Sequence, residues 1–293
     1  MSQRHLRRCA WLLWWWLALA MQPLPAASSP GYLLASEADV VALLPPPPAA
    51  DSAEQQADLR AVLEAQRAAH ANGTTAHAVA DVDASCARFS DALGDDLDAR
   101  NNATLLAFLN EAAMEGASLA GAPKKYWGRT RPYAYSAQVE RLGDVAPDWT
   151  PPPDLDQWAR RIESGSDAQA VTGQTPGSER AKAANKQASD YLAHSSYPSG
   201  HATFATVCAI VLADMVPEKR TQLFARSRDF AHGRLVVGAH FPTDVEAGRI
   251  LGTVAAQLLM QNASFQRDFA RARASLRAQL GLPAETPNLE PGH

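Results

Sequence analysis

Hydrophobic residues recur with the spacing of an α-helix along most of the chain. A first apolar stripe starts after a capping sequence at residues 51–52 and ends at a turn marked by Asn72-Gly73. A second stripe occupies residues 79–121 as one or two helices, and Gly121 and Pro123 stand where it should end. Because no segment alternates polar and apolar residues over the length of a strand, the pattern predicts an all-α fold.

The most apolar part of the chain lies in its C-terminal half. Residues 202–216 are almost continuously apolar, and the run opens at Pro198-Ser199-Gly200-His201 and stops at Pro217. This run is too short to cross a bilayer and too uniformly apolar for a surface helix, so it predicts a central core helix. Amphipathic helices are expected to follow it over residues 219–234, 244–261 and 264–280.

The N-terminus has the pattern of a secretory signal peptide. Three arginines precede a short apolar run at residues 10–21, and small residues follow at 26–29. A membrane anchor is the alternative, but the run is shorter than the ~20 residues that a span needs. We therefore expect residues 1–27 to be cleaved as a signal peptide, and the mature protein to be located in the periplasm or secreted.

The mature chain is expected to have one helical domain and a short arm. Residues 28–50 are rich in proline and small residues and include Pro45-Pro46-Pro47-Pro48. Because such a run fits neither a helix nor a central strand, we interpret residues 28–50 as an extended arm lying on the body. Residues 51–282 then form a single compact multi-helix domain.

Composition and charge exclude several classes of protein. The chain is 46% apolar and 20% charged with a formal net charge of −4, which indicates a full core and no basic surface for nucleic acid. Its three cysteines exclude a disulfide-built mini-scaffold and a zinc site made of cysteine clusters. Cys86 and Cys208 remain after removal of the signal peptide, and in an oxidising compartment they form either one disulfide or two separate buried thiols.

A first polar cluster is the basic sequence KKYWGRTRP at residues 124–132. It concentrates Lys124, Lys125, Arg129 and Arg131 in an otherwise acidic chain. A solvated basic turn is the simplest explanation. The functional alternative is an anion clamp, because guanidinium groups bind phosphate oxygens in pairs and a lysine adds a point charge.

A second polar cluster opens the apolar helix at Ser199, Gly200 and His201. The first backbone N–H groups of a helix have no partners within it and attract anions. Gly200 lets the backbone approach a ligand closely, and Ser199 can cap the helix or donate a hydrogen bond. A plain helix cap is the alternative for this sequence.

The third polar cluster is Arg234, His240 and Asp244. An aspartate bound to one ring nitrogen of a histidine fixes the tautomer and leaves the other nitrogen as a nucleophile. A metal-binding His–Asp pair is the alternative, but the accompanying arginines and lysines would repel a cation.

Taken in order, Lys-x6-Arg-Pro, Pro-Ser-Gly-His and Arg-x5-His-x3-Asp resemble the signature of the type 2 phosphatidic acid phosphatase superfamily, in particular the secreted class A bacterial acid phosphatases. The likeness extends to the sequences LLPPPPAADS, FLNEAAMEGA and VVGAHFPTDVEAGRI. It implies an all-helical fold shared with the haloperoxidases, no metal and no cofactor. It also implies hydrolysis of small-molecule phosphate monoesters through a phosphohistidine, with phosphotransfer to alcohols as a side activity.

The resemblance assigns a role to each residue of the three motifs. His240 attacks phosphorus, Asp244 orients His240, and His201 protonates the leaving group. Phosphate binding falls to Lys124, Arg131, Ser199, Gly200 and Arg234. The resemblance implies no partner besides the substrate, no nucleic acid and no membrane after signal cleavage, and it allows a homo-oligomer.

The sequence departs from the family pattern at two places. Gly233 precedes Arg234 where the family usually has a serine, which removes one hydroxyl. Residues 133–197 are polar and longer than usual, and they predict an excursion with short helical pieces, such as residues 179–192. The extra length, around residues 161–185, would form a lid or rim and would affect the substrate range more than the reaction.

Three alternative functions remain. A vanadium-dependent haloperoxidase-like enzyme would have a similar oxyanion site, but the shorter chain disfavours it. A membrane lipid phosphatase is disfavoured because the mature chain lacks an apolar run long enough to span a bilayer. A phosphate-binding protein would have no use for His201, His240 and Asp244.

Overall fold

The computed structural model describes residues 31–33, 37–94, 97, 102–143, 190 and 192–284 of the 293-residue chain. The chain divides into two units at Gly31, and all the helices below belong to the second unit, Tyr32–His293. Every element within the described ranges is helical, which confirms the predicted all-α fold. The expected signal peptide and residues 144–189 of the polar excursion lie outside the described residues.

The proline-rich arm contains a helix, and the prediction of a wholly extended arm is wrong for this part. Helix α2 spans Glu37–Leu43, because the seven residues EADVVAL before the first of the four prolines contain no helix breaker. Val40 of α2 is buried in a cluster with Tyr197 and Leu251. The arm nevertheless lies on the body as expected, since the Tyr197 hydroxyl donates to the Pro45 carbonyl.

Helix α3 follows with the predicted boundaries. It spans Ala53–Asn72, the Ser52 hydroxyl caps its first turn by accepting from the Gln55 N–H at 3.1 Å, and Gly73 ends it at a φ of 69°. The second predicted stripe divides into several pieces. These are α4 (Thr75–Ala80), η1 (Cys86–Phe89), α5 (Ser90–Leu93) and α6 (Ala103–Ser118).

Two short helices carry the first polar cluster. Helix α7 spans Gly121–Trp127 and α8 spans Pro132–Tyr135. Pro123 was expected to mark only the end of the preceding stripe, yet it lies in the first turn of α7, where the missing N–H of proline is tolerated. The chain therefore turns sharply between α6 and α8 and brings Lys124 and Arg131 inward.

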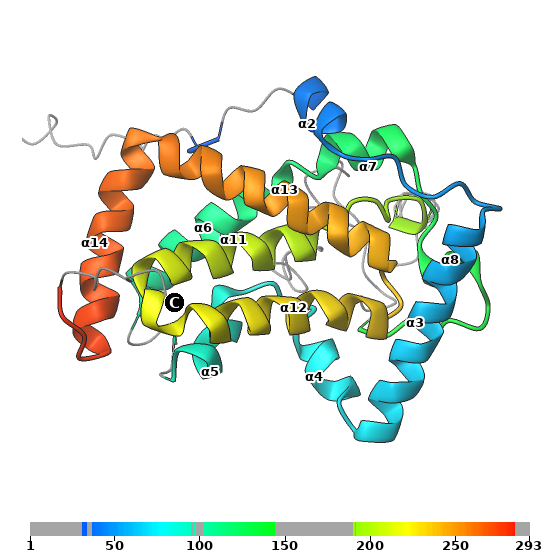
Figure 1. The fold of residues 1–293 in the computed structure, drawn as a ribbon, viewed down its shortest axis with the longest axis horizontal. Coiled ribbons are helices and arrows are strands. Elements are labelled where there is room, and N and C mark those ends of the chain that lie inside the picture. Colours follow the sequence, from blue (N-terminus) through cyan, green and yellow to red (C-terminus); the bar gives the residue numbers. More distant parts are fainter. Residues whose placement is uncertain are drawn as a thin grey trace, which may run out of the picture. The chain divides into compact units, whose positions relative to one another are not determined.

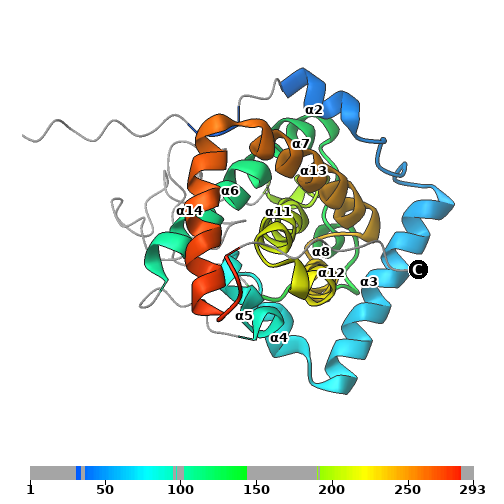
Figure 2. The same ribbon diagram turned by 60° about the vertical axis from the view of Figure 1, so that its left-hand side comes forward.

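The predicted core helix is the centre of the fold. Helix α11 spans Gly200–Met215, and only Ile210 and Asp214 of its residues are not buried. Figures 1 and 2 show α11 enclosed by α6, α12 and α13, and these three helices make its main contacts. The remaining C-terminal elements are η2 (Pro217–Lys219), α12 (Arg220–Val236), α13 (Pro242–Gln261) and α14 (Ala263–Gln279). No helix in the described part of the chain is both long enough and apolar enough to span a membrane.

Two glycines let α13 pack directly on the start of α11. A Cβ atom at Gly248 would lie 2.3 Å from the Ser199 carbonyl oxygen, and one at Gly252 would lie 2.7 Å from that of Thr203. The Ser199 N–H also donates to the Asp244 carbonyl at 2.9 Å. The second and third polar clusters of the sequence are therefore held side by side by backbone contact.

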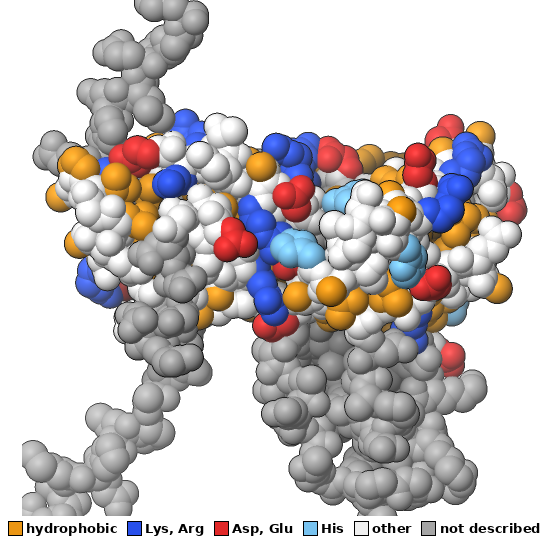
Figure 3. All heavy atoms as spheres, turned by 90° about the horizontal axis from the view of Figure 1, so that it is seen from below, with side chains coloured by type: hydrophobic (Ala, Val, Ile, Leu, Met, Phe, Trp, Pro, Cys, Tyr) orange, Lys and Arg blue, Asp and Glu red, His pale blue; other side chains and the backbone are white. Residues whose placement is uncertain are grey.

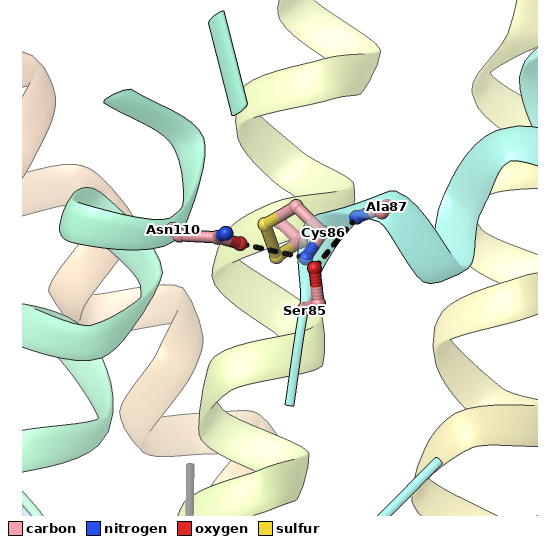
Figure 4. Close-up of a disulfide and its surroundings, with 5 residues drawn as sticks. Ser85, Cys86, Ala87 and Asn110 are labelled. Carbon is pink, nitrogen blue, oxygen red and sulfur yellow. Dashed lines mark hydrogen bonds between the residues drawn. A yellow bond between two sulfur atoms is a disulfide. The ribbon is translucent and has the colours of Figure 1, made fainter. Parts of the chain in front are cut away.

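A disulfide joins the centre of α11 to η1. Cys86 and Cys208 are bonded, with their Cα atoms 5.9 Å apart, which decides between the two states left open by the sequence (Figure 4). The Cys86 N–H donates to the Asn110 side chain of α6 at 2.8 Å. The segment between α4 and η1 is thus anchored to two core helices.

Candidate active site

The three polar clusters meet where α11 begins. The chain after α7 pairs with the segment before α11, since the Arg131 N–H donates to the Ala193 carbonyl at 2.7 Å. Arg131 Nη1 lies 3.3 Å from His240 Nε2, in the turn between α12 and α13. Sequence motifs separated by more than a hundred residues therefore form one site.

Two of the predicted phosphate-binding cations are held by backbone carbonyls. Lys124 and Arg131 are only 3% and 5% exposed. Lys124 Nζ donates to the Ser195 carbonyl at 2.6 Å, and Arg131 Nη2 donates to the same oxygen at 3.2 Å. Arg131 Nε also donates to the Leu192 carbonyl at 2.8 Å. These backbone hydrogen bonds hold both cationic side chains beside the Ser195 carbonyl.

Arg234 supplies the third predicted cation from the last turn of α12. Its side chain is 5% exposed. Its positive charge contributes to lowering the pKa of both His201 and His240. Lys125, by contrast, is exposed on α7.

His240 is fully buried and its tautomer is defined by the backbone. Nδ1 lies 2.7 Å from the Ser196 carbonyl oxygen, which can only accept, so Nδ1 carries the proton. Nε2 therefore presents its lone pair toward Arg131. Burial, followed by the charges of Arg131, Lys124 and Arg234, lowers the pKa of His240 well below its usual value. The lowered pKa favours the neutral form of the ring.

Asp244 reaches His240 differently from the expected direct hydrogen bond. Its Oδ2 atom is 3.7 Å from His240 Nδ1. The carboxylate instead accepts from the Ser196 hydroxyl at 2.6 Å and the Phe241 N–H at 2.7 Å. Asp244 thus fixes the residue whose carbonyl holds the ring, and it remains close enough to stabilise positive charge on that ring.

Arg129 is a site residue that the sequence motif did not identify. It is 8% exposed, and Nη1 donates to Asp244 Oδ1 at 2.6 Å. Nη2 donates to Asp58 Oδ2 at 2.7 Å and to Gln55 Oε1 at 2.6 Å, both on α3. Spacing could not reveal this role, because α3 is more than seventy residues away in sequence. The unusual density of cations in residues 124–131 was the only available signal.

His201, in the first turn of α11, has the opposite tautomer. Its Nε2 atom lies 3.1 Å from the Val82 carbonyl, so Nε2 carries the proton. Nδ1 is buried and has no hydrogen-bond partner among the described residues. Burial, then the charge of Arg234, with smaller effects of His240 and Arg131, lowers the pKa of His201 well below its usual value.

Ser199 and Gly200 are both buried at the start of α11. The Ser199 hydroxyl accepts from the Ala202 N–H at 3.3 Å, so this serine caps the helix, as one of its two expected roles. The first N–H groups of α11 lie in the same turn as His201 and form a potential anion site. Among the described residues, no group of three or more His, Cys, Asp or Glu side chains could hold a metal ion.

The chain is similar in sequence to known proteins over the region that forms this site. The family model described as the PAP2 superfamily matches residues 104–268, which is more than half of the chain. The non-specific acid phosphatase of Salmonella typhimurium is 38% identical over 87 residues, which cover 30% of this chain and 35% of that protein. The acid phosphatase of Zymomonas mobilis is 37% identical over 93 residues, which cover 32% and 35%.

A third relative shows the same limited coverage. The non-specific acid phosphatase of Providencia stuartii is 33% identical over 78 residues, or 27% of this chain and 32% of that protein. The chain thus spans about a third of the length of these curated relatives. The family match includes all three polar motifs, from Lys124 to Asp244. The chain therefore belongs to the PAP2 superfamily.

Proposed function

We propose that the protein is a secreted or periplasmic acid phosphatase that hydrolyses small-molecule phosphate monoesters without a metal, through a phosphohistidine on His240. The observation that carries the proposal is the arrangement of two buried histidines among three buried cations. His240 presents Nε2 and His201 presents Nδ1, while the second nitrogen of each ring is bound to a backbone carbonyl. A purely anion-binding site needs cations but no such pair of opposed tautomers.

In the first step, Lys124, Arg131 and Arg234 hold the phosphate oxygens. The phosphate takes up the Arg131 N–H that otherwise points to His240 Nε2. Nε2 then attacks phosphorus in line with the leaving oxygen, so that a P–N bond forms and the P–O ester bond breaks. The three cations stabilise charge on the equatorial oxygens in the transition state. His201, protonated on both nitrogens, gives its Nδ1 proton to the departing alkoxide.

In the second step, His201 has the neutral tautomer seen in the structure, with its proton on Nε2. Nδ1 therefore accepts a proton from water as the water oxygen attacks phosphorus and the P–N bond breaks. An alcohol in place of water would take the phosphoryl group instead. Throughout, the proton stays on His240 Nδ1 and remains hydrogen-bonded to the Ser196 carbonyl, while Asp244 stabilises the charge of the phosphorylated ring.

The shifted pKa values favour an acidic working range. His240 must be neutral, and its lowered pKa leaves it neutral down to acidic pH. His201 must be protonated for the first step, and its lowered pKa means that protonation needs acidic pH. A bound phosphate dianion opposes this shift, because it stabilises the positive ring.

Two further features support the proposal. The matching relatives are named as acid phosphatases. The disulfide between Cys86 and Cys208 is of the kind that persists in oxidising compartments outside the cytosol.

The proposal is tested by hydrolysis of p-nitrophenyl phosphate between pH 4 and 8 after exhaustive dialysis against a chelator. We expect activity that is highest at acidic pH, that is unaffected by the chelator and that is lost in His240→Ala. A loss of activity that zinc or magnesium restores would contradict metal independence. Bromide oxidation by the vanadate-loaded protein, without monoesterase activity, would instead indicate a haloperoxidase.

A further inference from the structure

A buried ion pair lies outside the three motifs, on two segments that contact His201. Arg226 of α12 donates from Nη2 to Asp81 Oδ1 at 2.5 Å, and the two side chains are 9% and 1% exposed. Arg226 Nε donates to the Arg88 carbonyl at 2.8 Å. One guanidinium group therefore binds both ends of the segment 81–88, which runs from the end of α4 into η1.

The same segment is also bound at Cys86. The disulfide to Cys208 fixes it to α11, two helical turns after His201, and the Asn110 side chain binds the Cys86 N–H (Figure 4). The segment 81–88 is thus held by three core helices, namely α6, α11 and α12. On the face of the molecule shown in Figure 3, Lys and Arg side chains are interspersed with Asp and Glu, whereas the Arg226–Asp81 pair is buried.

These contacts fix the position of the Val82 carbonyl group. Val82, directly after Asp81, accepts the hydrogen bond from His201 Nε2 at 3.1 Å. Arg226 also lies 5.5 Å from the centre of the Phe230 ring, and this ring stacks on His201 with centroids 6.2 Å apart. Arg226 therefore contacts both the segment that carries the carbonyl and the ring that packs on the imidazole.

We propose that Asp81 and Arg226 are positioning residues for His201: they hold the Val82 carbonyl so that the proton stays on Nε2 and Nδ1 faces the leaving group. This inference rests on the proposed phosphatase function. Stability alone does not explain the pair, because a buried ion pair is often no more stabilising than apolar side chains of similar size. An apolar side chain at position 226, however, could not bind both Asp81 and the Arg88 carbonyl.

The experiment compares leaving groups in Arg226→Met and Asp81→Asn. We measure the rate of enzyme phosphorylation by rapid quench with p-nitrophenyl phosphate and with an alkyl phosphate such as glycerol phosphate. A nitrophenolate leaves without a proton, whereas an alkoxide needs one from His201. We expect Arg226→Met to lower the alkyl rate about tenfold relative to the aryl rate, Asp81→Asn to have the same selective effect to a smaller degree, and Arg226→Lys to restore part of the ratio.

A matched control and a double variant make the result decisive. Arg277→Met removes another arginine–carboxylate pair, in which the buried Arg277 donates to Glu218 at 2.9 Å. Arg277 also donates to the carbonyl of Met215, which is the last residue of α11, whereas His201 lies in the first turn of that helix. It should lower stability and leave the alkyl-to-aryl ratio unchanged. In a His201→Ala background, Arg226→Met should not lower the ratio further, because the two changes act on one group. An equal loss on both esters, or an additive loss in the double variant, would overturn the inference.

A measurement without substrate separates this inference from the proposed function. Nitrogen-15 NMR of labelled histidine reports which nitrogen of His201 is protonated. We expect a single Nε2-protonated tautomer in the unmodified protein and a mixture of tautomers in Asp81→Asn. A single unchanged tautomer in Asp81→Asn would overturn the inference, even if the enzyme were active. A chain without monoesterase activity would overturn the proposed function itself, and the role in catalysis with it.

Discussion

The two buried histidines are held by the same kind of contact but by different parts of the molecule. His240 binds the Ser196 carbonyl through Nδ1, and His201 binds the Val82 carbonyl through Nε2. Ser196 lies between the motifs, on a segment that Asp244 fixes directly. Val82 lies 119 residues before His201, on a segment that no motif includes.

The two histidine side chains belong to sequence motifs, but the carbonyl groups that fix the protonated nitrogen of each ring lie outside these motifs. Both partners of the rings are backbone atoms, so any residue type could supply them. The tautomers are opposite, which suits the opposite duties that we propose, with Nε2 of His240 as the nucleophile and Nδ1 of His201 as the proton donor. The predictions below separate these two duties and then the supports behind them.

The largest effect is expected when the two histidines are removed in turn. His240→Ala should lose activity on every ester, by about 10⁴-fold or more, because no covalent route remains. His201→Ala should keep phosphorylation by p-nitrophenyl phosphate and lose turnover on alkyl phosphates. Steady-state and rapid-quench kinetics measure both, with the exposed His232→Ala as control. Equal losses in the two variants on the aryl ester would contradict the assigned roles.

Substitution of Arg129 should mainly lower the free energy of unfolding. The sequence predicts a mild effect for Arg129, because the motif does not place it on phosphate, but the structure shows it between Asp58 and Asp244. Arg129→Met leaves two buried carboxylates without their common partner, and we expect a loss of about 3–5 kcal/mol in the free energy of unfolding. Urea denaturation measures it. A midpoint unchanged from that of the exposed control Lys125→Met would show that Arg129 does not hold α3 to α13.

Removal of a predicted phosphate-binding cation should cost a similar or slightly smaller free energy than loss of Arg129, but in transition-state stabilisation rather than in unfolding. Arg131→Ala or Arg234→Ala should lower kcat/KM by about 2–4 kcal/mol of transition-state stabilisation, because the contact strengthens as charge develops on the phosphoryl oxygens. Lys125→Ala should change kcat/KM little, since that side chain is exposed. If Lys125→Ala proved as costly as Arg131→Ala, the assignment of the first motif would be wrong.

Ser196 tests how Asp244 reaches His240. Ser196→Ala removes the hydroxyl that donates to Asp244 and keeps the carbonyl that holds Nδ1. We expect a loss of about 1–2 kcal/mol in kcat/KM, and Asp244→Asn should be more harmful because it also removes the negative charge near the ring. A Ser196→Ala variant with unchanged kinetics would show that the direct 3.7 Å approach of Asp244 to His240 is sufficient.

The smallest expected effect is the change in the free energy of unfolding with pH. Both histidines have a pKa well below the usual value of 6.5. Above about pH 6.5 they are neutral in both the folded and the unfolded states, and below it the unfolded state takes up protons first. The free energy of unfolding should therefore fall as the pH falls, by about 1 kcal/mol per pH unit for each histidine. Denaturation of His201→Phe should show a shallower fall between pH 6.5 and 5, and an unchanged slope would contradict the lowered pKa.

Most of the helices can be predicted from the sequence for physical reasons, and the structure brings residues of the three motifs together. Helical spacing and caps such as Ser52 are local, and the uniform apolarity of residues 202–216 can only fit a core. The arm is predicted less well, because the four prolines dominate its composition although they begin only after Leu44. Arg129 with Asp58, and Val82 with His201, depend on contacts across more than seventy residues, and no local pattern encodes them.

The most direct test of the central claim is to trap the phosphorylated enzyme. Rapid quench with labelled p-nitrophenyl phosphate, followed by peptide mapping under alkaline conditions, identifies the residue that carries phosphate. The account predicts alkali-stable label on His240, which accumulates in His201→Ala and is absent from His240→Ala. Label on residue 201, or continued labelling of the His240→Ala protein, would contradict it.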